Sequence, residues 1–428
     1  MRDDNLNPVE SASCAFESGV DNYRTIREDQ PVQTQNQLVS AGELQLRAAA
    51  LVPMLKDQAA ECERQRQRQV SVEVMRAIQD AELLRAMQPA RFGGFEHDFD
   101  VMLHLGAELG RGCGSTGWVF GVLSDHQWML GLFPFESQVD VWGEDPRAFV
   151  SASYAPSATA EVVQGGYRLS GKWGFASGCD HASWHMVGAL IPGDDGGPPR
   201  PHLMLVPHAD YRIEDDWFSV GLAGSGSKDV ILDNVFVPAH RAVSFASLSV
   251  GGALVNDSPL YQLPFASVVT IGTLSTVLGI TRGAIESFLE SARTKTSIGG
   301  ATRGSTKVAE SVPVQQAAAA ASAWLDAAEL LVQRDIAVAQ AKVSAGETLS
   351  VEDRVRCRRD YAMAAGLCVR AVNTVFEKSG ARGMHLRNPV QRCWRDVNVA
   401  ARHVGLSWDI NSLPYGRYAL GLDPKGQY

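Results

Sequence analysis

The chain has 428 residues, of which 45% are hydrophobic and 20% charged, an ordinary balance for a soluble globular protein. This length predicts two or three domains, or one unit of several layers, with ample room for a core. The formal net charge of -9 argues against a nucleic-acid surface, which needs a basic patch. No apolar run reaches the roughly 18 residues that a membrane span needs. The acidic and polar stretch Met1–Glu10 is not typical of a signal peptide.

The seven cysteines contain no CxxC pair, and their number is odd. This pattern indicates free thiols in a reducing cytoplasm. The ligand spacing of a zinc site is absent, so no metal is expected.

The first part of the chain is predicted to be helical after a polar, mobile tail over residues 1–38. Apolar residues recur at helical spacing from Ser40 to Met87, and a further helix is expected through Met102 to Leu109. Ser115 is expected to cap the next helix, which carries Trp118 and His126 two turns apart on roughly one face. We therefore interpret residues 39–147 as an N-terminal helical domain.

The period changes to two over residues 148–250, which predicts a central β-barrel domain. Gly165 and Gly166 indicate a hairpin between two strands. Further strand-like runs are Ser183–Ile191, His202–Pro207 and Val230–Val237.

Long helical runs return over residues 251–428 and predict a four-helix bundle. The runs are 261–297, 311–345, 351–380 and 389–408. The last run places Arg392, Asp396 and His403 on one helical face among small apolar residues. Such a face is either a buried polar network or part of a functional site.

Two segments of the β domain leave two interpretations open. The Gly-rich segment Gly221–Ser227 lacks the strand–turn–helix setting of a nucleotide-binding turn. It is either a tight loop or a loop whose N–H groups approach a flat or anionic ligand, and Ser225 and Ser227 fit both. The segment Trp173–His181 is either a barrel strand ending in a turn or the wall of a site for a planar heterocycle. In the second case Trp173 and Phe175 supply apolar surface and Ser177 supplies a hydroxyl near a ring nitrogen.

Single histidines on apolar helices, such as His126 and His403, are more often core residues than catalytic groups. Together with Ser151 and Ser153, however, they make a polar pocket a reasonable hypothesis. Arg293 ends a helix, where a cation is favourable for the helix dipole, or where it can clamp an anion.

Four stretches, in a helix–β–helix order, carry a resemblance to the acyl-CoA dehydrogenase fold, an α+β architecture. They are Cys113–Trp118, Gly171–Trp184, Gly221–Pro238 and Asn388–Asp409. Within that fold the chain looks like the oxygenase components of two-component flavin-dependent monooxygenases, of the 4-hydroxyphenylacetate 3-hydroxylase kind. The resemblance covers roughly residues 40–428.

The resemblance implies roles for individual residues. Trp118 lines the flavin site, Ser177 lies beside flavin N5, and Arg293 helps to hold the flavin, often across a subunit interface. His126 and either Ser151 or Ser153 belong to the substrate pocket, and His403 lies near the reacting ring. Further flavin contacts are expected from Trp173, Phe175, Gly224, Ser225, Ser227, Gly380 and Gly383.

The resemblance also implies a reaction. A separate NAD(P)H:flavin reductase supplies reduced FMN or FAD, and O2 adds to the flavin to give a C4a-hydroperoxide that hydroxylates a phenolic or fused aromatic substrate. His403 is the first choice for the base that deprotonates the phenol. His126 is the second choice, or the group that holds the substrate oxygen. A homotetramer in the cytoplasm is expected.

Three alternatives differ in chemistry. An N- or S-oxygenase on the same scaffold would act on an amino sugar, an indole or a thiophene. An acyl-CoA dehydrogenase would need a catalytic glutamate, but His403 and Asp409 stand where that base would be sought. In the glycine-rich loop, Ala223 and Ser225 also replace the usual arginine and threonine. A non-catalytic helical interaction protein would bind no flavin.

Overall fold

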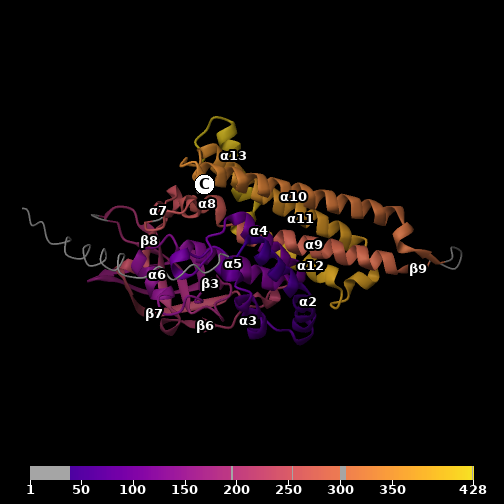
Figure 1. The fold of residues 1–428 in the computed structure, drawn as a ribbon, viewed down its shortest axis with the longest axis horizontal. Coiled ribbons are helices and arrows are strands. Elements are labelled where there is room, and N and C mark those ends of the chain that lie inside the picture. The colour runs from indigo at the N-terminus through magenta and orange to yellow at the C-terminus, as the bar shows by residue number, and fades with distance from the viewer. Residues whose placement is uncertain (1–38, 194–195, 253, 299–304, 427) are drawn as a thin grey trace, which may run out of the picture. The chain divides into compact units, whose positions relative to one another are not determined.

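The computed structural model describes residues 39–193, 196–252, 254–298, 305–426 and 428. The expected mobile tail over residues 1–38 lies outside the described residues. Val39–Tyr428 forms one compact unit by its internal contacts, so the three-domain division stays an interpretation of the order of elements. The order is helices, then strands, then helices, which confirms the α+β class (Figure 1).

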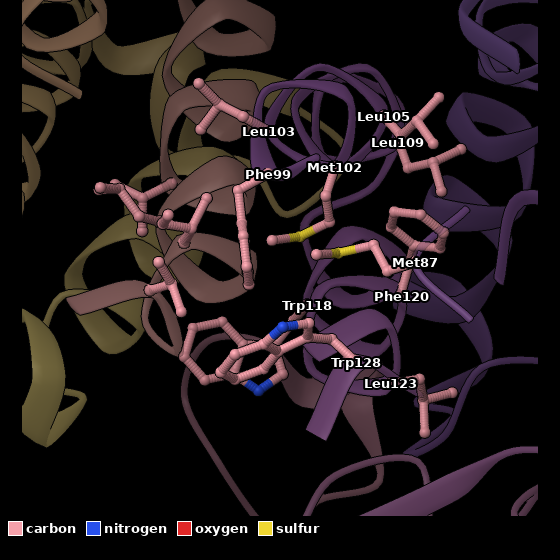
Figure 2. Close-up of a cluster of buried hydrophobic side chains, with 14 of the residues drawn as sticks. Met87, Phe99, Met102, Leu103, Leu105, Leu109, Trp118, Phe120, Leu123 and Trp128 are labelled. Carbon is pink, nitrogen blue, oxygen red and sulfur yellow. The ribbon is translucent and has the colours of Figure 1, made fainter. Parts of the chain in front are cut away.

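In the part of the chain that the structure describes, five α-helices precede the strands: α2 (Ala41–Gln65), α3 (Val72–Asp80), α4 (Phe99–Gly112), α5 (Gly114–Leu130) and α6 (Phe135–Trp142). Ser40 caps α2 and Asp98 caps α4, because each side chain accepts a hydrogen bond from an amide in the first turn. The apolar faces of α2, α4 and α5 meet in one core. Figure 2 shows Phe99 and Met102 of α4 beside Trp118 and Trp128 of α5 in this core.

Helix α5 is almost entirely buried, from Gly114 to Leu130. The prediction that Ser115 caps it is wrong, because the residue at the N-cap position is Cys113. The Ser115 hydroxyl instead accepts a hydrogen bond from the amide of Gly224, 3.1 Å away in the β region. Ser115 therefore joins α5 to the glycine-rich loop.

The β region consists of two four-stranded sheets that enclose a second apolar core. One sheet has the order β1-β4-β5-β8 and the other β2-β3-β7-β6, and β1 and β4 are the parallel neighbours. The strands are β1 (Val150–Thr159), β2 (Glu161–Val163), β3 (Gly166–Ala176), β4 (Trp184–Ile191), β5 (Arg200–Pro207), β6 (Arg212–Glu214), β7 (Lys228–Pro238) and β8 (Ala242–Ser244). The antiparallel pairing of β2 with β3 confirms the hairpin at Gly165 and Gly166.

The C-terminal helices lie largely as the periodicity predicted. Three long helices are α9 (Ile271–Thr294), α10 (Val312–Ser344) and α11 (Val351–Glu377), and Figure 1 shows them running side by side. The fourth predicted helix, α12 (Pro389–Ala400), has only 12 residues. Shorter elements are α7 (Phe245–Val250), α8 (Phe265–Val268), α13 (Trp408–Ala419) and the strand pair β9 (Thr296–Ile298) and β10 (Ser305–Lys307).

Helix α12 ends earlier than predicted, at Ala400. His403 therefore does not share a helical face with Arg392 and Asp396, and that prediction is wrong. His403 begins a short 3-10 turn, Val404–Leu406, with an extended backbone conformation. The His403 ring lies 5.7 Å from the ring of Trp118 on α5.

The stretch Phe265–Thr294 is long and apolar enough to cross a membrane by length and composition, with a mean hydropathy of 1.5, although no such run was expected. Its most apolar window is 89% buried inside the fold, as in the core helix of a soluble protein. It packs against α4, α5, α11 and α12.

The loop before β7 is attached to α12 at three points. The Leu222 amide donates to the Asp396 carboxylate at 2.7 Å, and the Arg395 guanidinium donates to the carbonyl of Val220 at 2.9 Å. Gly221 lies so close to α12 that a Cβ there would be 2.2 Å from the carbonyl oxygen of Arg395. Only glycine fits this contact.

We expect Asp396→Ala to destabilise the protein by about 1–3 kcal/mol, because the buried Leu222 amide would lose its acceptor. Asp396→Asn should cost less, since its side-chain oxygen can still accept the hydrogen bond. The free energy of unfolding in urea measures both effects, and Asp423→Ala, at an exposed carboxylate, is the control. Equal losses for the alanine and asparagine variants would contradict this role of the carboxylate oxygen.

Candidate active site

A cavity of about 630 Å³ lies where α5, the strands β1 and β3, the loop before β7 and the segment after α12 meet. Its size is that of a typical small-molecule or cofactor site. The wall is mostly apolar, with polar groups concentrated at a few positions. The lining residues used below are Trp118, Asp125, His126, Ser153, Tyr154, Phe175, Ser177, Ser227 and His403.

One end of the cavity carries a chain of hydrogen-bonded side chains. The Trp118 indole N–H donates to the Ser177 hydroxyl at 3.1 Å. Ser177 and Ser227 share a hydrogen bond of 2.7 Å, and Ser227 and Ser225 share one of 2.8 Å. Ser177 and Ser227 line the cavity, whereas Ser225 is buried behind them. The chain fixes the position of the Ser177 hydroxyl, which can donate toward the cavity or toward Ser227.

Phe175 stands beside this end with 78% of its surface exposed, an unusual amount for an aromatic side chain. Its backbone φ is +60°, in the left-handed region that non-glycine residues rarely adopt. Such strain persists only where the surrounding structure enforces it, often at functional sites. The Phe175 ring meets Trp217 edge-on at 6.2 Å.

The structure corrects the expected position of Trp173. This side chain is fully buried between the two sheets, where its indole N–H donates to the carbonyl of Gly188 at 2.7 Å. The pairing of β3 with β7 is irregular between Trp173 and Ala176, and Phe175 lies inside this irregularity. In a regular strand Trp173 and Phe175 would lie on the same face. Here Trp173 is buried in the core, and of the two only Phe175 reaches the cavity.

His126 has one defined tautomer. Its Nδ1 lies 2.9 Å from the carbonyl oxygen of Val150, which can only accept, so Nδ1 carries the proton. Burial lowers the pKa of His126 to about 4, so the ring is neutral near pH 7 and Nε2 holds a lone pair. The ring meets Tyr154 edge-on at 5.6 Å.

His403 has the opposite tautomer. Its Nδ1 accepts a hydrogen bond from the Gly405 amide at 3.2 Å, so the neutral ring carries its proton on Nε2. Burial, with a smaller contribution from the Arg358 cation, lowers the pKa of His403 to about 4. The ring lies 5.7 Å from the Trp118 ring, which places it near the hydroxyl chain. In this form His403 donates a hydrogen bond through Nε2.

The two candidate serines on β1 differ in their surroundings. Ser153 belongs to the cavity wall, and its hydroxyl donates to the carbonyl of Gly174 at 2.9 Å. Ser151 is buried and hydrogen-bonds to His185 at 2.7 Å, outside the cavity. Of the two, Ser153 is the one that the structure brings to the pocket.

The other expected flavin contacts are divided among three places. Gly224 lines an adjacent cavity on the far side of Trp217 and Phe218. Gly380 lines a separate cavity of about 710 Å³ at the ends of α9 and α11, and Gly383 follows it in the same turn. Arg293 is exposed near the end of α9. None of these four residues reaches the cavity beside Ser177 within one chain.

Sequence reasoning missed Asp125 and Tyr154, which both line the cavity. Asp125 carried a usable signal, because an acidic residue in a helix that is apolar on every side needs an explanation. Tyr154 carried none, since an aromatic residue in a strand is ordinary.

The residues at the hydroxyl end fit a flavin ring. Phe175 offers an exposed aromatic face, Ser177 a hydroxyl within reach of a ring nitrogen, and Trp118 holds that hydroxyl in place. The remaining volume extends along α5 toward His126, where a second, smaller ring can lie. The cavity thus has room for a cofactor and a substrate in contact.

Comparison with known proteins identifies the family of the chain. The family described as acyl-CoA dehydrogenase, C-terminal domain, matches residues 271–408. The FADH(2)-dependent resorcinol hydroxylase, oxygenase component, of Rhizobium sp. (strain MTP-10005) is 37% identical over 407 residues, which cover 93% of this chain and 98% of the relative.

Solved structures show the same similarity over most of the chain. The 3-HSA hydroxylase from Rhodococcus sp. RHA1 superposes with a TM-score of 0.84 at 34% identity and covers 90% of this chain and 98% of its own. XiaF from Streptomyces sp., in complex with FADH2 and glycerol, gives 0.83 at 30% identity over 90% and 97% of the two chains. The fold is therefore that of the acyl-CoA dehydrogenases. Within it, this chain belongs to the oxygenase components of two-component flavin-dependent monooxygenases.

Protonation of buried histidines should weaken the fold in acid. Burial lowers the pKa of His185 to about 3 from the ordinary histidine value of 6.5, which applies in the unfolded chain. The unfolded chain then binds more protons as the pH falls below 6.5, so stability is lost by up to about 1.4 kcal/mol per pH unit. His185→Gln removes this contribution, and we expect its free energy of unfolding to fall less steeply than that of the wild type between pH 6.5 and 4. Parallel profiles in urea would contradict the neutral, buried state of His185.

Proposed function

We propose that this oxygenase component hydroxylates a phenolic substrate held between the flavin end of the cavity and His126. One observation carries the proposal: Ser177 and His126 line the same cavity, Ser177 is held by Trp118 of α5, and the Nδ1 contact of His126 with Val150 leaves its Nε2 lone pair available. The names of the similar proteins agree, since one is a resorcinol hydroxylase. An N- or S-oxygenase would have little use for a base at this position.

Reduced flavin with O2 supplies the oxygen atom that is transferred to the aromatic ring. The protein would position the flavin and the substrate, keep water from the reacting atoms and accept the phenolic proton. Ser177 would donate a hydrogen bond to the flavin near N5, with its orientation set by Trp118 and Ser227. The apolar wall, including Val122, Val269 and Val399, keeps water from the reacting atoms.

His126 is the better base on structural grounds, although the sequence favoured His403. His126 lines the cavity and its Nδ1–H is held by Val150, so its Nε2 lone pair could accept the phenolic proton without a change of tautomer. His403 already uses its lone pair on the Gly405 amide. Its Nε2–H suits it to hold the developing phenolate oxygen or the flavin. Removal of the phenolic proton raises the nucleophilicity of the ortho carbon that takes the oxygen.

A second subunit would complete the flavin site in this proposal. The cavity around Gly380 is lined by four cations, Lys295, Lys307, Lys378 and Arg382, and by one acidic residue, Glu310, and its excess of positive charge suits a phosphate group. Arg293 lies on the same end of α9. Large apolar side chains are exposed near the C-terminus, on and after α13, as a subunit contact requires. They are Trp408, Ile410, Leu413, Leu420 and Leu422. These features support the homotetramer, with the flavin of one subunit reaching the cations of another.

The reduced flavin would come from a separate NAD(P)H:flavin reductase, as the term oxygenase component in the relatives' names indicates. FADH2 is the favoured form, because the similar resorcinol hydroxylase is FADH(2)-dependent and XiaF binds FADH2. A cytoplasmic location agrees with the six cysteines of the described chain, which are all free thiols.

Anaerobic mixing of the protein with FADH2 or reduced FMN, followed by O2 and a phenol in a stopped-flow spectrometer, tests the function. We expect FADH2 to bind more tightly, and isotopically labelled O2 to place one labelled oxygen in the product. Oxidation of the flavin without a labelled product, across simple phenols and dihydroxybenzenes, would overturn the proposal. Labelled oxygen on nitrogen or sulfur of an indole or thiophene, with none on phenols, would favour the other oxygenases.

We expect His126→Ala to lower kcat/KM for a phenol by about 100-fold near pH 7, as for loss of a general base. The deficit should shrink at alkaline pH, where the phenol ionises in solution. His403→Gln, which retains a donor, should lose less and keep the wild-type pH profile. A deficit of His126→Ala that is the same at every pH would show that His126 is not the base.

A further inference from the structure

The ionisable residues that line the cavity do not balance in charge. They are Asp125, His126, Tyr154, Arg402 and His403. Burial raises the pKa of Asp125 and of Tyr154 well above their usual ranges, and it lowers the pKa of both histidines to about 4. These four groups are therefore uncharged near pH 7. An arginine keeps its proton at any such pH, so Arg402 gives the cavity wall a positive charge.

Arg402 belongs to the flavin end of the cavity. It immediately precedes His403, whose ring lies 5.7 Å from the ring of Trp118, and Trp118 holds the Ser177 hydroxyl. Arg402 is exposed, and in the part of the chain that the structure describes it forms no hydrogen bond and no ion pair. Its charge is therefore available to a ligand.

A second cation, Arg358 of α11, lies close to His403. Helix α11 packs against the turn Val404–Leu406, and the charge of Arg358 adds to the effect of burial in lowering the pKa of His403. The Arg358 Nε is buried and has no hydrogen-bond partner among the described residues. Two arginines thus contribute positive potential at this end of a largely apolar cavity, which favours a bound anion.

The two redox forms of a flavin differ in the charge of their ring system. The oxidised ring is neutral, whereas the reduced ring loses its N1 proton near neutral pH and becomes an anion. The phosphate groups of FAD are the same in both forms. A cation at the flavin end therefore favours the reduced form over the oxidised form, and because charges attract over several ångströms it can do so without touching one particular atom.

We propose that Arg402 makes the cavity select reduced flavin over oxidised flavin by attracting the anionic reduced ring. This inference rests on the flavin site at Ser177 that the proposed function uses, and it does not depend on the identity of the phenol. Arg402 acts as a selectivity residue for the cofactor. An enzyme that takes reduced flavin from solution must release the oxidised form after each turnover, and weaker binding of the neutral ring assists that release.

Anaerobic calorimetric titration with FAD in each redox form measures this selectivity without turnover. At pH 8 we expect Arg402→Gln to weaken binding of reduced FAD by about 10-fold, as for loss of one partly screened charge pair, and binding of oxidised FAD by less than about 2-fold. Arg402→Lys keeps the charge and should retain most of the selectivity. Arg76→Gln removes an exposed arginine of α3 outside the cavity wall and should change neither dissociation constant.

Lower pH should reduce the effect of the substitution, because N1 of reduced flavin gains a proton and the ring loses its charge. Between pH 8 and pH 6 we expect the selectivity of the wild type to fall toward that of Arg402→Gln. Both cavity histidines stay neutral over this range. Asp125, Tyr154 and Arg358 are common to the two proteins, so the difference between their titrations reports on Arg402.

Two results would overturn this role of Arg402. Equal weakening of both redox forms in Arg402→Gln would show that the residue acts on the phosphates or on the fold. Unchanged binding of both forms would exclude an effect on the flavin, and a kcat/KM lowered for 4-hydroxybenzoate but not for phenol would then assign Arg402 to an anionic substrate. Either result leaves the hydroxylase function standing. Wild-type protein that selects reduced FAD but forms no labelled product would instead overturn the proposed function alone.

Discussion

The loop Gly221–Ser227 is held between two helices that are far apart in the sequence, and the site depends on this hold. Asp396 of α12 accepts the Leu222 amide, and Ser115 of α5 accepts the Gly224 amide. The loop then presents Ser227 to Ser177 at 2.7 Å. Because the backbone of this loop is fixed at two points, the hydroxyl groups of Ser227 and Ser177 stay within hydrogen-bonding distance when no ligand is bound. Preorganised hydrogen-bond donors of this kind stabilise charge more effectively than groups that must first rearrange.

In each of the two cavity histidines, the hydrogen bond made by Nδ1 decides whether Nε2 is a donor or an acceptor. His126 gives its Nδ1 proton to a carbonyl group, whereas His403 receives an amide proton at Nδ1. Burial keeps both rings neutral near pH 7. The same side chain is therefore an acceptor at one end of the cavity and a donor at the other. A hydroxyl group that loses its proton needs an acceptor for the proton and a donor for the resulting oxyanion, and the two histidines could serve as these two partners.

Periodicity predicted most of the elements, because helices and strands bury one face at a fixed spacing. The hairpin at Gly165 and the long helices α9, α10 and α11 follow from such patterns. The sequence also predicted that Trp118 and His126 lie on roughly one helical face, and both residues line the cavity, because one helix sets both positions.

The features that were missed depend on tertiary contacts. The irregular pairing of β3 and the positive φ of Phe175 place the Phe175 and Trp173 side chains in different surroundings. A phenylalanine in the sequence gives no sign of a positive φ. Helix α12 ends at Ala400 without a glycine or proline to mark it, so His403 was placed on the wrong element. The tautomers of the histidines depend on backbone groups of Val150 and Gly405, which only the folded chain brings near.

A single uninterrupted helix, α5, carries Trp118, Val122, Asp125 and His126 into one cavity. In the proposed function, the side chains that would contact the cofactor and those that would contact the substrate therefore occupy successive turns of the same helix. On that proposal, substitutions on the later turns would change which substrates are accepted, while the turn of Trp118 would keep its contact with the flavin. Such an arrangement lets descendants of one ancestral enzyme diversify in substrate without reinventing oxygen chemistry.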